Sequence, residues 1–326
     1  MRSIRTWLSA AVPLVCAAAI VGCGSSNSSS TSAAAGAAPT SSSTSAASTG
    51  TGTSASTGTS SGTGTTGSGG TVSVPAAIKS KGTITVAADA SYPPNEFVGP
   101  DGKTVVGMDA DLMKALGAAM GLKVNIVNET FDSIIPGLAS GKYDVGASSF
   151  TDTKEREKTV DFVDYFSAGE SFFTKASGGA SVSSLSDICG KTVAVEKGTT
   201  EESDAQAQSA KCKKAGKPAV SVQSFNDQNG ANLALSSGRA QLGFADSPVA
   251  DYQVKKSNGQ FKLTGPSFAN APYGLAVPKK SGLAPAIEAA LKMVMANGTY
   301  SKILTKWGIQ SGALPASKVA INGATS

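Results

Sequence analysis

The feature that most constrains the fold is a repeated alternation of strand-like and helix-like segments between residues 82 and 296. Residues 82–88 form a short apolar run with β-branched residues, which is typical of a buried strand. A helix is then predicted from apolar residues that recur every four positions and stop at a glycine, namely Met108, Leu112, Leu116, Met120 and Gly121. Repeated units of this kind imply parallel sheets with helices on both faces, and therefore an α/β fold.

The same alternation continues through the rest of this region. Thr199 followed by Glu202 is a capping box, which predicts a helix start at Thr200. Further helices are predicted from Asp132 to Leu138, from Thr200 to about Cys212 and from Leu283 to Ala296, and further strands at residues 123–127, 143–147, 191–195, 219–225, 241–245 and 273–277.

Polar side chains follow four of the predicted strands at the point where each strand ends. Open α/β sheets bind ligands in the crevice beyond the carboxyl ends of their strands, so we expect these groups to converge. Each cluster taken alone is also compatible with ordinary turn or cap chemistry. The residues concerned are Asp89 and Tyr92, Ser148 and Ser149, Thr199 and Thr200, and Asp246.

The chemistry of this set matches an α-amino acid. Arg156 offers a planar fork of donors suited to a carboxylate, and Ser148, Ser149, Thr151, Thr199 and Thr200 add polar groups. The N-terminus of the Thr200 helix favours an anion. Asp246 can accept an ammonium, and Tyr92 and Phe131 can enclose an apolar stem.

Composition excludes several other classes of function. The chain contains no His, which excludes His-based catalysis and argues against a zinc site, so we expect no metal and no cofactor. The net charge of +5 becomes +3 if Arg2 and Arg5 are removed with a signal segment. That excess is too small to indicate nucleic-acid binding.

The N-terminus predicts export. Arg2 and Arg5 precede an apolar stretch, residues 6–21, which is typical of a secretory signal, the alternative being a marginal membrane anchor. The sequence Ile20-Val21-Gly22-Cys23 resembles the lipobox of bacterial lipoproteins. That resemblance implies cleavage before Cys23 and a lipid on its thiol, with two acyl chains such as palmitate for stable anchoring.

Residues 24–71 are almost entirely Ser, Thr, Gly and Ala, without acidic or basic residues. With nothing to bury, such a segment cannot offset its ordering entropy, so we predict a disordered tether. Further along, Cys189 and Cys212 would form one disulfide in an oxidising exterior. Two buried free thiols are the alternative.

Motifs along residues 82–307 resemble the family-3 extracellular solute-binding proteins, the polar amino acid receptors of ABC importers. These motifs include Asp89-Ala-Ser-Tyr92-Pro-Pro, Val106-Gly-Met-Asp109-Ala-Asp111-Leu112, Phe131-Asp-Ser-Ile-Ile-Pro136-Gly-Leu, Gly141-Lys-Tyr-Asp144, Ser148-Ser149-Phe-Thr151-Asp-Thr153-Lys-Glu-Arg156, Gly198-Thr199-Thr200, Tyr273-Gly274-Leu-Ala-Val277 and Asn297-Gly298-Thr299-Tyr300.

The resemblance implies a two-lobed periplasmic-binding-protein fold of type II, each lobe a mostly parallel sheet with flanking helices. Chain crossings are expected near Ala168–Glu170 and Ala271. The implied bounds are a signal peptide at 1–22, a lipid-anchored tether at 23–71, lobe 1 at 72–169 plus 272–316, lobe 2 at 170–271 and a flexible tail at 317–326.

The resemblance also implies roles for single residues. Arg156, with Thr151 and Thr200, would hold the ligand carboxylate, and Asp246 with Ser149 the ammonium. Asp89 would face a cationic side chain, or else serve as a turn residue, while Asp109 and Asp111 would cap the following helix. Asn95 departs from members that often have an aromatic there.

The expected protein is thus a monomeric, non-enzymatic receptor on the outer face of the cytoplasmic membrane. It would bind a polar or cationic amino acid and deliver it to an ABC permease. Two alternatives remain open from sequence: a sensory module that signals to a receptor, and a dehydratase on the same fold, for which Glu196 beside Gly198 would be a candidate acid or base.

Overall fold

The computed structural model describes residues 72–324, which belong to one compact unit. The predicted signal peptide (1–22), the lipid-anchor residue Cys23 and the tether (24–71) lie outside the described residues, as do the last two residues.

A central eight-stranded sheet organises the described part of the chain. Its two sides are parallel: β1 pairs with β5 and β6, and β8 pairs with β9 and β10. Between them run two long antiparallel strands, β7 and β11. The strand order is β5 (Lys123–Asn128), β1 (Thr83–Ala88), β6 (Val145–Gly146), β11 (Phe261–Pro278), β7 (Val160–Lys175), β10 (Leu242–Asp246), β8 (Thr192–Glu196) and β9 (Ser221–Phe225).

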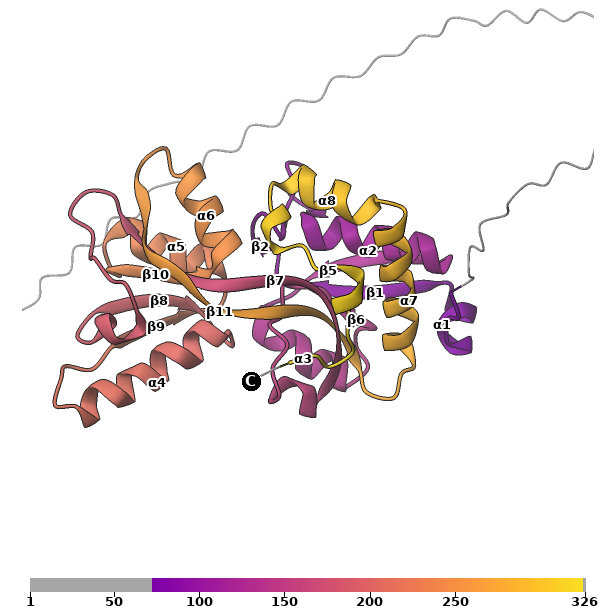
Figure 1. Ribbon diagram of the computed structural model, residues 1–326, viewed down its shortest axis with the longest axis horizontal. Coiled ribbons are helices and arrows are strands. Elements are labelled where there is room, and N and C mark those ends of the chain that lie inside the picture. Colours follow the sequence, from indigo (N-terminus) through magenta and orange to yellow (C-terminus); the bar gives the residue numbers. More distant parts are fainter. Residues whose placement is uncertain (1–71, 325–326) are drawn as a thin grey trace, which may run out of the picture. The chain divides into compact units, whose positions relative to one another are not determined.

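The helices divide into two groups, one around each end of the long strands (Figure 1). With β1, β5 and β6 lie α1 (Ala76–Lys81), α2 (Met108–Met120), α3 (Phe131–Ala139), α7 (Leu283–Ala296) and α8 (Thr299–Trp307). With β8, β9 and β10 lie α4 (Thr200–Lys214), α5 (Gln228–Ser237) and α6 (Ser247–Lys256). A small antiparallel sheet of β2 (Ser91–Tyr92), β3 (Glu96–Val98) and β4 (Val105–Val106) belongs to the first group.

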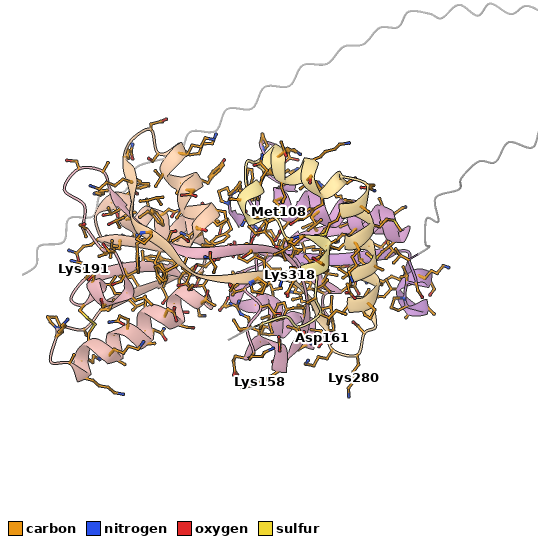
Figure 2. All side chains as sticks on the ribbon, in the orientation of Figure 1. Met108, Lys158, Asp161, Lys191, Lys280 and Lys318 are labelled. Atoms are coloured by element: carbon orange, nitrogen blue, oxygen red, sulfur yellow. A yellow bond between two sulfur atoms is a disulfide. The ribbon has the colours of Figure 1, made fainter. Side chains whose placement is uncertain are left out.

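Each group of elements has its own hydrophobic core. In the first, the predicted helix face of α2 is buried, since Met108, Leu112 and Leu116 are fully inaccessible to solvent and pack against β1 and α7. Met108 is labelled at the start of α2 in Figure 2. In the second, Val193 and Phe244 form a separate cluster. Two cores joined by two strands make a mixed α/β protein of two lobes, as expected.

The long strands β7 and β11 pair irregularly where they pass from one lobe to the other. Glu170 pairs with Phe268 and Ala168 with Ala271, with register shifts on either side of Phe268. The predicted crossings fall at this irregular segment. We keep the predicted bounds as working names: lobe 1 for residues 72–169 and 272–316, and lobe 2 for residues 170–271.

The C-terminal segment differs from the expectation of a flexible tail. Residues 316–318 form a short 3₁₀ turn, η4, and Val319 is buried in the core of lobe 1. Ile321 forms a β-bridge with Val163 of β7. The reason is an apolar pair, Val319 and Ile321, that can pack on the sheet, so residues 316–324 belong to lobe 1.

The predicted disulfide is confirmed. Cys189 and Cys212 are bonded, with their Cα atoms 5.7 Å apart, and the bond joins the segment before β8 to the last turn of α4. Within residues 72–324, no helix combines the length and apolar character that a membrane crossing needs.

Candidate ligand-binding site

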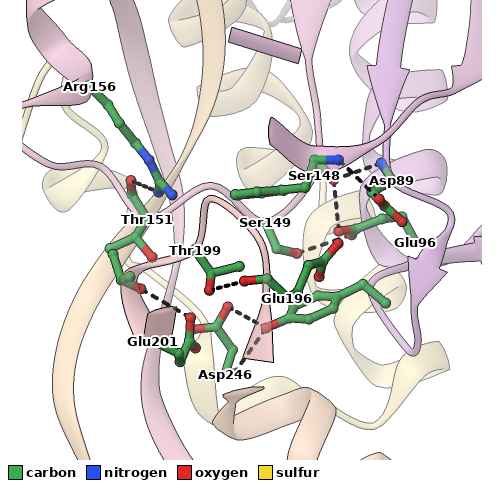
Figure 3. A pocket seen from close by; sticks show the side chains of 13 residues that line it. Asp89, Glu96, Ser148, Ser149, Thr151, Arg156, Glu196, Thr199, Glu201 and Asp246 are labelled. Carbon is green, nitrogen blue, oxygen red and sulfur yellow. Dashed lines mark hydrogen bonds between the residues drawn. The ribbon is translucent and has the colours of Figure 1, made fainter. Parts of the chain in front are cut away.

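A pocket between the lobes collects every residue predicted for the site. Its lining draws side chains from both lobes. The ten predicted residues in its lining are Asp89, Tyr92, Phe131, Ser148, Ser149, Thr151, Arg156, Thr199, Thr200 and Asp246, and three acidic residues, Glu96, Glu196 and Glu201, complete it (Figure 3).

On the lobe 1 side, strand ends supply the polar groups as expected. Asp89 follows β1 and Ser148 follows β6, and these strands are parallel neighbours. The main-chain N–H of Asp89 donates to Ser148 Oγ at 2.8 Å. The Asp89 carboxylate accepts from the N–H of Phe131, the first residue of α3, at 3.0 Å. Neighbouring strand ends and a helix N-terminus therefore fix this wall of the pocket.

A buried carboxyl pair, Glu96 and Asp109, holds the serine turn in place. Ser149 adopts a left-handed conformation with φ of 48° and donates through Oγ to Glu96 at 3.0 Å. Its N–H donates to Asp109 Oδ2 at 2.9 Å, and Tyr165 donates to Asp109 Oδ1 at 2.6 Å. Burial raises the pKa of Asp109 to about 6 and that of Glu96 well above its ordinary value.

The expectation that Asp109 and Asp111 cap the following helix is wrong. The N-cap of α2 is Gly107, and no side chain caps it. Asp109 instead supports Ser149, as described above, and Asp111 accepts from Lys306 and from Trp307 Nε1 on α8. Because the helix already begins at Met108, Asp109 and Asp111 lie inside its first turn, and both contact residues from distant parts of the chain.

Arg156 reaches from lobe 1 across to lobe 2. Its guanidinium donates to the carbonyl of Thr151 at 2.7 Å and to the carbonyl of Gly198 at 3.0 Å. It also lies over the Phe131 ring, 5.3 Å from the centroid. Since a guanidinium has five N–H donors, three remain for a ligand.

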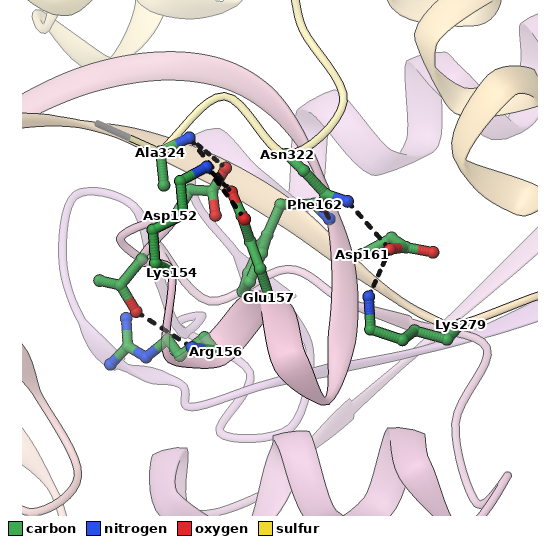
Figure 4. A network of polar contacts seen from close by, with 10 residues as sticks. Asp152, Lys154, Arg156, Glu157, Asp161, Phe162, Lys279, Asn322 and Ala324 are labelled. Atoms are coloured by element: carbon green, nitrogen blue, oxygen red, sulfur yellow. Dashed lines mark hydrogen bonds and ion pairs between the residues drawn. The ribbon is translucent and has the colours of Figure 1, made fainter. Parts of the chain in front are cut away.

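The C-terminal segment supports the loop that carries Arg156 (Figure 4). Ala324 donates to Asp152 Oδ2 at 3.1 Å, and Asp152 in turn donates its N–H to the carbonyl of Pro272 at 2.9 Å. Asn322 accepts from the N–H of Phe162 at 2.8 Å. The residues expected to be a loose tail therefore help to position the loop from Thr151 to Arg156.

On the lobe 2 side, the start of α4 faces the pocket. Thr199 is the N-cap, as the sequence predicts, and its Oγ1 accepts from the N–H of Glu202 at 3.1 Å. In a capping box the Glu202 carboxylate would accept from the main-chain N–H of the N-cap residue, Thr199. Here it accepts from the N–H of the preceding residue, Gly198, at 2.7 Å. Thr200 is the first helical residue, so the N-terminal end of α4 lies at the pocket wall.

Asp246 ends β10 and meets Tyr92 of lobe 1. The Tyr92 hydroxyl donates to Asp246 Oδ2 and accepts from the Asp246 N–H, both at 3.0 Å. Burial raises the pKa of Asp246 to about 6. Tyr92, which the sequence suggested only as a surface for the ligand stem, thus also joins the two lobes.

Sequence reasoning did not place Glu96, Glu196 or Glu201 in the site. Glu196, the last residue of β8, entered the sequence analysis only as a candidate acid or base of the dehydratase alternative, and it is 2% exposed. Glu201 is 1% exposed, although it stands in the first turn of a polar helix. The rule that polar groups at strand ends converge also applies to Glu196 and could have found it.

The pocket lining is strongly acidic. Among the thirteen residues that line it, Arg156 alone is a cation, while Asp89, Glu96, Glu196, Glu201 and Asp246 carry carboxyl groups. Burial raises the pKa of each of these carboxyls, so each gains stability from a nearby positive charge or a proton. The site therefore favours a cation, with one place for an anion at Arg156.

Contacts across the cleft hold the two lobes together around the pocket. Ser91 of lobe 1 accepts from the N–H of Gln228 of lobe 2 at 3.0 Å. Asp132 of lobe 1 pairs with Lys197 of lobe 2 at 2.7 Å. With the Tyr92–Asp246 bonds, these contacts describe a closed arrangement of the lobes.

Two lobes joined by two strands, with an interlobe pocket of this polarity, define a binding protein for a small charged solute. The chain belongs to the bacterial extracellular solute-binding proteins, family 3, whose family model matches residues 84–310.

Relatives and solved structures agree with this assignment. An arginine-binding protein of Corynebacterium glutamicum is 36% identical over 228 residues, covering 70% of this chain and 74% of the relative. The ABC transporter arginine-binding protein 1 of Escherichia coli is 32% identical over 225 residues, covering 67% and 87%. An ancestral arginine-binding protein bound to arginine has 41% identity and a TM-score of 0.64, covering 69% and 98%. These proteins are named for binding, and the expectation of a non-enzymatic protein is confirmed.

Proposed function

We propose that this protein binds a cationic amino acid, arginine foremost, between its lobes and delivers it to an ABC permease as a monomeric, lipid-anchored receptor. The observation that carries the proposal is the charge pattern of the pocket: one guanidinium beside five carboxyl groups. A ligand that complements this pattern has one carboxylate and more than one positive charge. The names of the relatives support the same choice.

The ligand carboxylate binds Arg156, which keeps free donors, together with Thr151, Thr200 and the N-terminal end of α4. The α-ammonium binds Asp246 and Ser149. The aliphatic stem lies beside Phe131 and Tyr92, and the side-chain cation faces Asp89. Ser148 and Thr199 keep the walls in position through their bonds to Asp89 N–H and Glu202 N–H.

The number of polar groups is sufficient for tight, reversible binding. Hydrogen bonds to charged groups contribute about 1.5–3 kcal/mol each. Four or five of them, less the costs of association and closure, leave roughly −8 kcal/mol, which corresponds to a micromolar dissociation constant. No covalent step is required, as befits a receptor that must release its cargo.

Closure supplies the signal for transport. A ligand that touches both lobes favours the closed state, because only closure completes its contacts. The pocket draws Arg156 and Asp89 from lobe 1 and Asp246 and Thr200 from lobe 2. The permease would distinguish the loaded receptor by this closed arrangement.

Binding is tested by calorimetry of the purified protein against the twenty common amino acids and ornithine. Arginine, lysine or ornithine should bind with micromolar or better affinity, and glutamate should not bind. Binding restricted to acidic or apolar amino acids would contradict the proposal, because it would require a pocket of a different charge.

Anchoring is tested separately through Cys23. The mature protein should fractionate with the membrane and carry the mass of a diacylglycerol at its N-terminus. The variant Cys23→Ala should appear in the soluble fraction with unchanged ligand affinity. A wild-type protein without lipid mass would remove the anchor and leave the binding proposal standing.

A further inference from the structure

Two acidic side chains from opposite lobes face each other inside the pocket. Asp89 follows β1 of lobe 1, and Glu196 ends β8 of lobe 2 (Figure 3). They are 4% and 2% exposed, and their carboxyl groups lie within hydrogen-bonding reach of each other. Because the lobes contribute one acid each, these groups approach only when the cleft is closed.

The carboxyl group of Glu196 has no cation beside it among the described residues. The charged groups that face it are Asp89, Asp227 and Asp246, all acidic. The adjacent Lys197 pairs with Asp132 instead, at 2.7 Å. Thr199 donates to the main-chain carbonyl of Glu196 and leaves its carboxyl group free.

One oxygen of Glu196, Oε1, is buried without a hydrogen-bond partner in residues 72–324. Burial, and next the charge of Asp89, raise the pKa of Glu196 well above its ordinary value. Two buried carboxylates so close together cannot both remain ionised without a third group. In the closed protein that third group is either a proton or a positive charge from the ligand.

We propose that Glu196 determines ligand specificity: together with Asp89 it forms a clamp of two carboxylates, one from each lobe, that closes on the cationic end of the ligand. The clamp rests on the proposed function and refines it, because it assigns the side-chain cation to a pair of acids instead of to Asp89 alone. A guanidinium suits this position, since its planar fork has donors on more than one edge.

The clamp also couples binding to protons. Below the pKa of the pair, a proton occupies the place of the ligand cation, and arginine must displace it. The affinity for a cationic ligand therefore rises with pH while the pair titrates, and protons are released on binding. A neutral ligand of the same shape gains nothing from this change.

The test compares arginine with its neutral isostere citrulline by calorimetry. In the wild type, arginine should bind at least 100 times more tightly than citrulline. In Glu196→Gln this preference should fall at least tenfold, through weaker arginine binding. The matched control is Glu288→Gln, which removes one negative charge on α7, where Glu288 pairs with Lys292 away from the pocket, and it should keep the wild-type preference.

A second measurement does not depend on the variant being folded. Titrating wild-type protein at pH 6, in two buffers of different ionisation enthalpy, should show more protons released by arginine than by citrulline, since the two ligands share the α-ammonium that faces Asp246 and differ only at the clamp. If the Glu196→Gln variant still melts cooperatively, it should release fewer protons than the wild type when arginine binds.

The possible failures are distinguishable. The clamp is overturned, and the proposed function left intact, if Glu196→Gln binds arginine tightly with an unchanged preference over citrulline. The same holds if arginine releases no more protons than citrulline on binding to the wild type. Wild-type protein that binds neither arginine nor another cationic amino acid overturns both.

Discussion

Single side chains in this protein carry out more than one task at once. Arg156 is tied to carbonyl groups of both lobes and still has donors left for a ligand. Tyr92 lines the pocket and also bonds to Asp246 in the other lobe. The proposed binding and the closed arrangement therefore share residues, and we expect a substitution at one of them to affect both.

The first prediction concerns Arg156. Arg156→Ala should weaken amino acid binding by more than about 100-fold, since two charge-assisted bonds at about 1.5 kcal/mol each amount to two decades in affinity. Arg156→Lys should be intermediate, because it keeps the charge and loses the fork. Calorimetry measures both, with thermal melting as the control for folding. An Arg156→Ala protein that binds normally would remove this residue from the site.

A second prediction concerns two buried acids in lobe 1, Asp152 and Asp164. They are 1% and 3% exposed and lie within hydrogen-bonding reach of each other. Burial, together with neighbouring negative charge, raises the pKa of Asp164 to about 8 and that of Asp152 to about 6. The folded protein therefore binds protons that the unfolded chain, with ordinary carboxyl pKa values near 4, releases.

The sign of the effect follows from this difference. The stabilising contribution of the protonated pair is complete below about pH 4 and is lost as the pH rises through 6 towards 8. Asp164→Asn should flatten the dependence of stability on pH between 6 and 8. Urea unfolding at several pH values measures it, and a variant with the wild-type slope would show that other groups govern this range.

At the scale of helices and strands, periodic sequence was a reliable guide. The strand at β1 and the helices α2 and α7 were predicted to within a residue or two, because long apolar repeats survive any tertiary context. The helices α5, α6 and α8 were not predicted. In α5 the buried residues are Gln228, Ala231, Ala234 and Leu235, and one large apolar side chain among them gives almost no periodic signal.

The site shows the same division between local and tertiary information. Strand ends identified seven of the lining residues, since the convergence of parallel strands is a property of the fold class, and the chemistry of an amino acid ligand added Phe131, Thr151 and Arg156. Glu96 lies in a three-residue strand, and its burial depends on serine hydroxyls more than 50 residues away. Such a position has no local sequence signal, because charged residues are buried only when distant groups satisfy them.

A third prediction belongs to the element that the disulfide secures. The bond between Cys189 and Cys212 closes a loop with a sequence separation of 23 and holds the end of α4. The double variant Cys189→Ser/Cys212→Ser should lose about 3 kcal/mol of unfolding free energy on the chain-entropy model. Neither cysteine lines the pocket, so arginine affinity should change little. A large loss of affinity in a fully folded double variant would show that the disulfide at the C-terminal end of α4 also positions its N-terminal end at the pocket.

At the scale of the whole molecule, affinity depends on contacts that never touch the ligand. In the proposed mechanism the lobes open and close, and a ligand that binds the closed state is held more weakly if that state becomes less populated. The pair Asp132–Lys197 joins the lobes, at 2.7 Å, and its side chains are 30% and 54% exposed. This pair therefore stabilises closure without belonging to the pocket lining.

The fourth prediction follows from that position. Lys197→Ala should weaken arginine binding two- to fivefold, since a solvent-exposed ion pair contributes about 0.2–1 kcal/mol, and the change should appear as faster dissociation. The matched control is Lys142→Ala, which breaks a pair of similar exposure with Glu129 inside lobe 1 and should leave affinity unchanged. Stopped-flow measurement of dissociation separates the two. Equal effects in both variants would mean that overall charge, and not closure of the lobes, sets the lifetime of the complex.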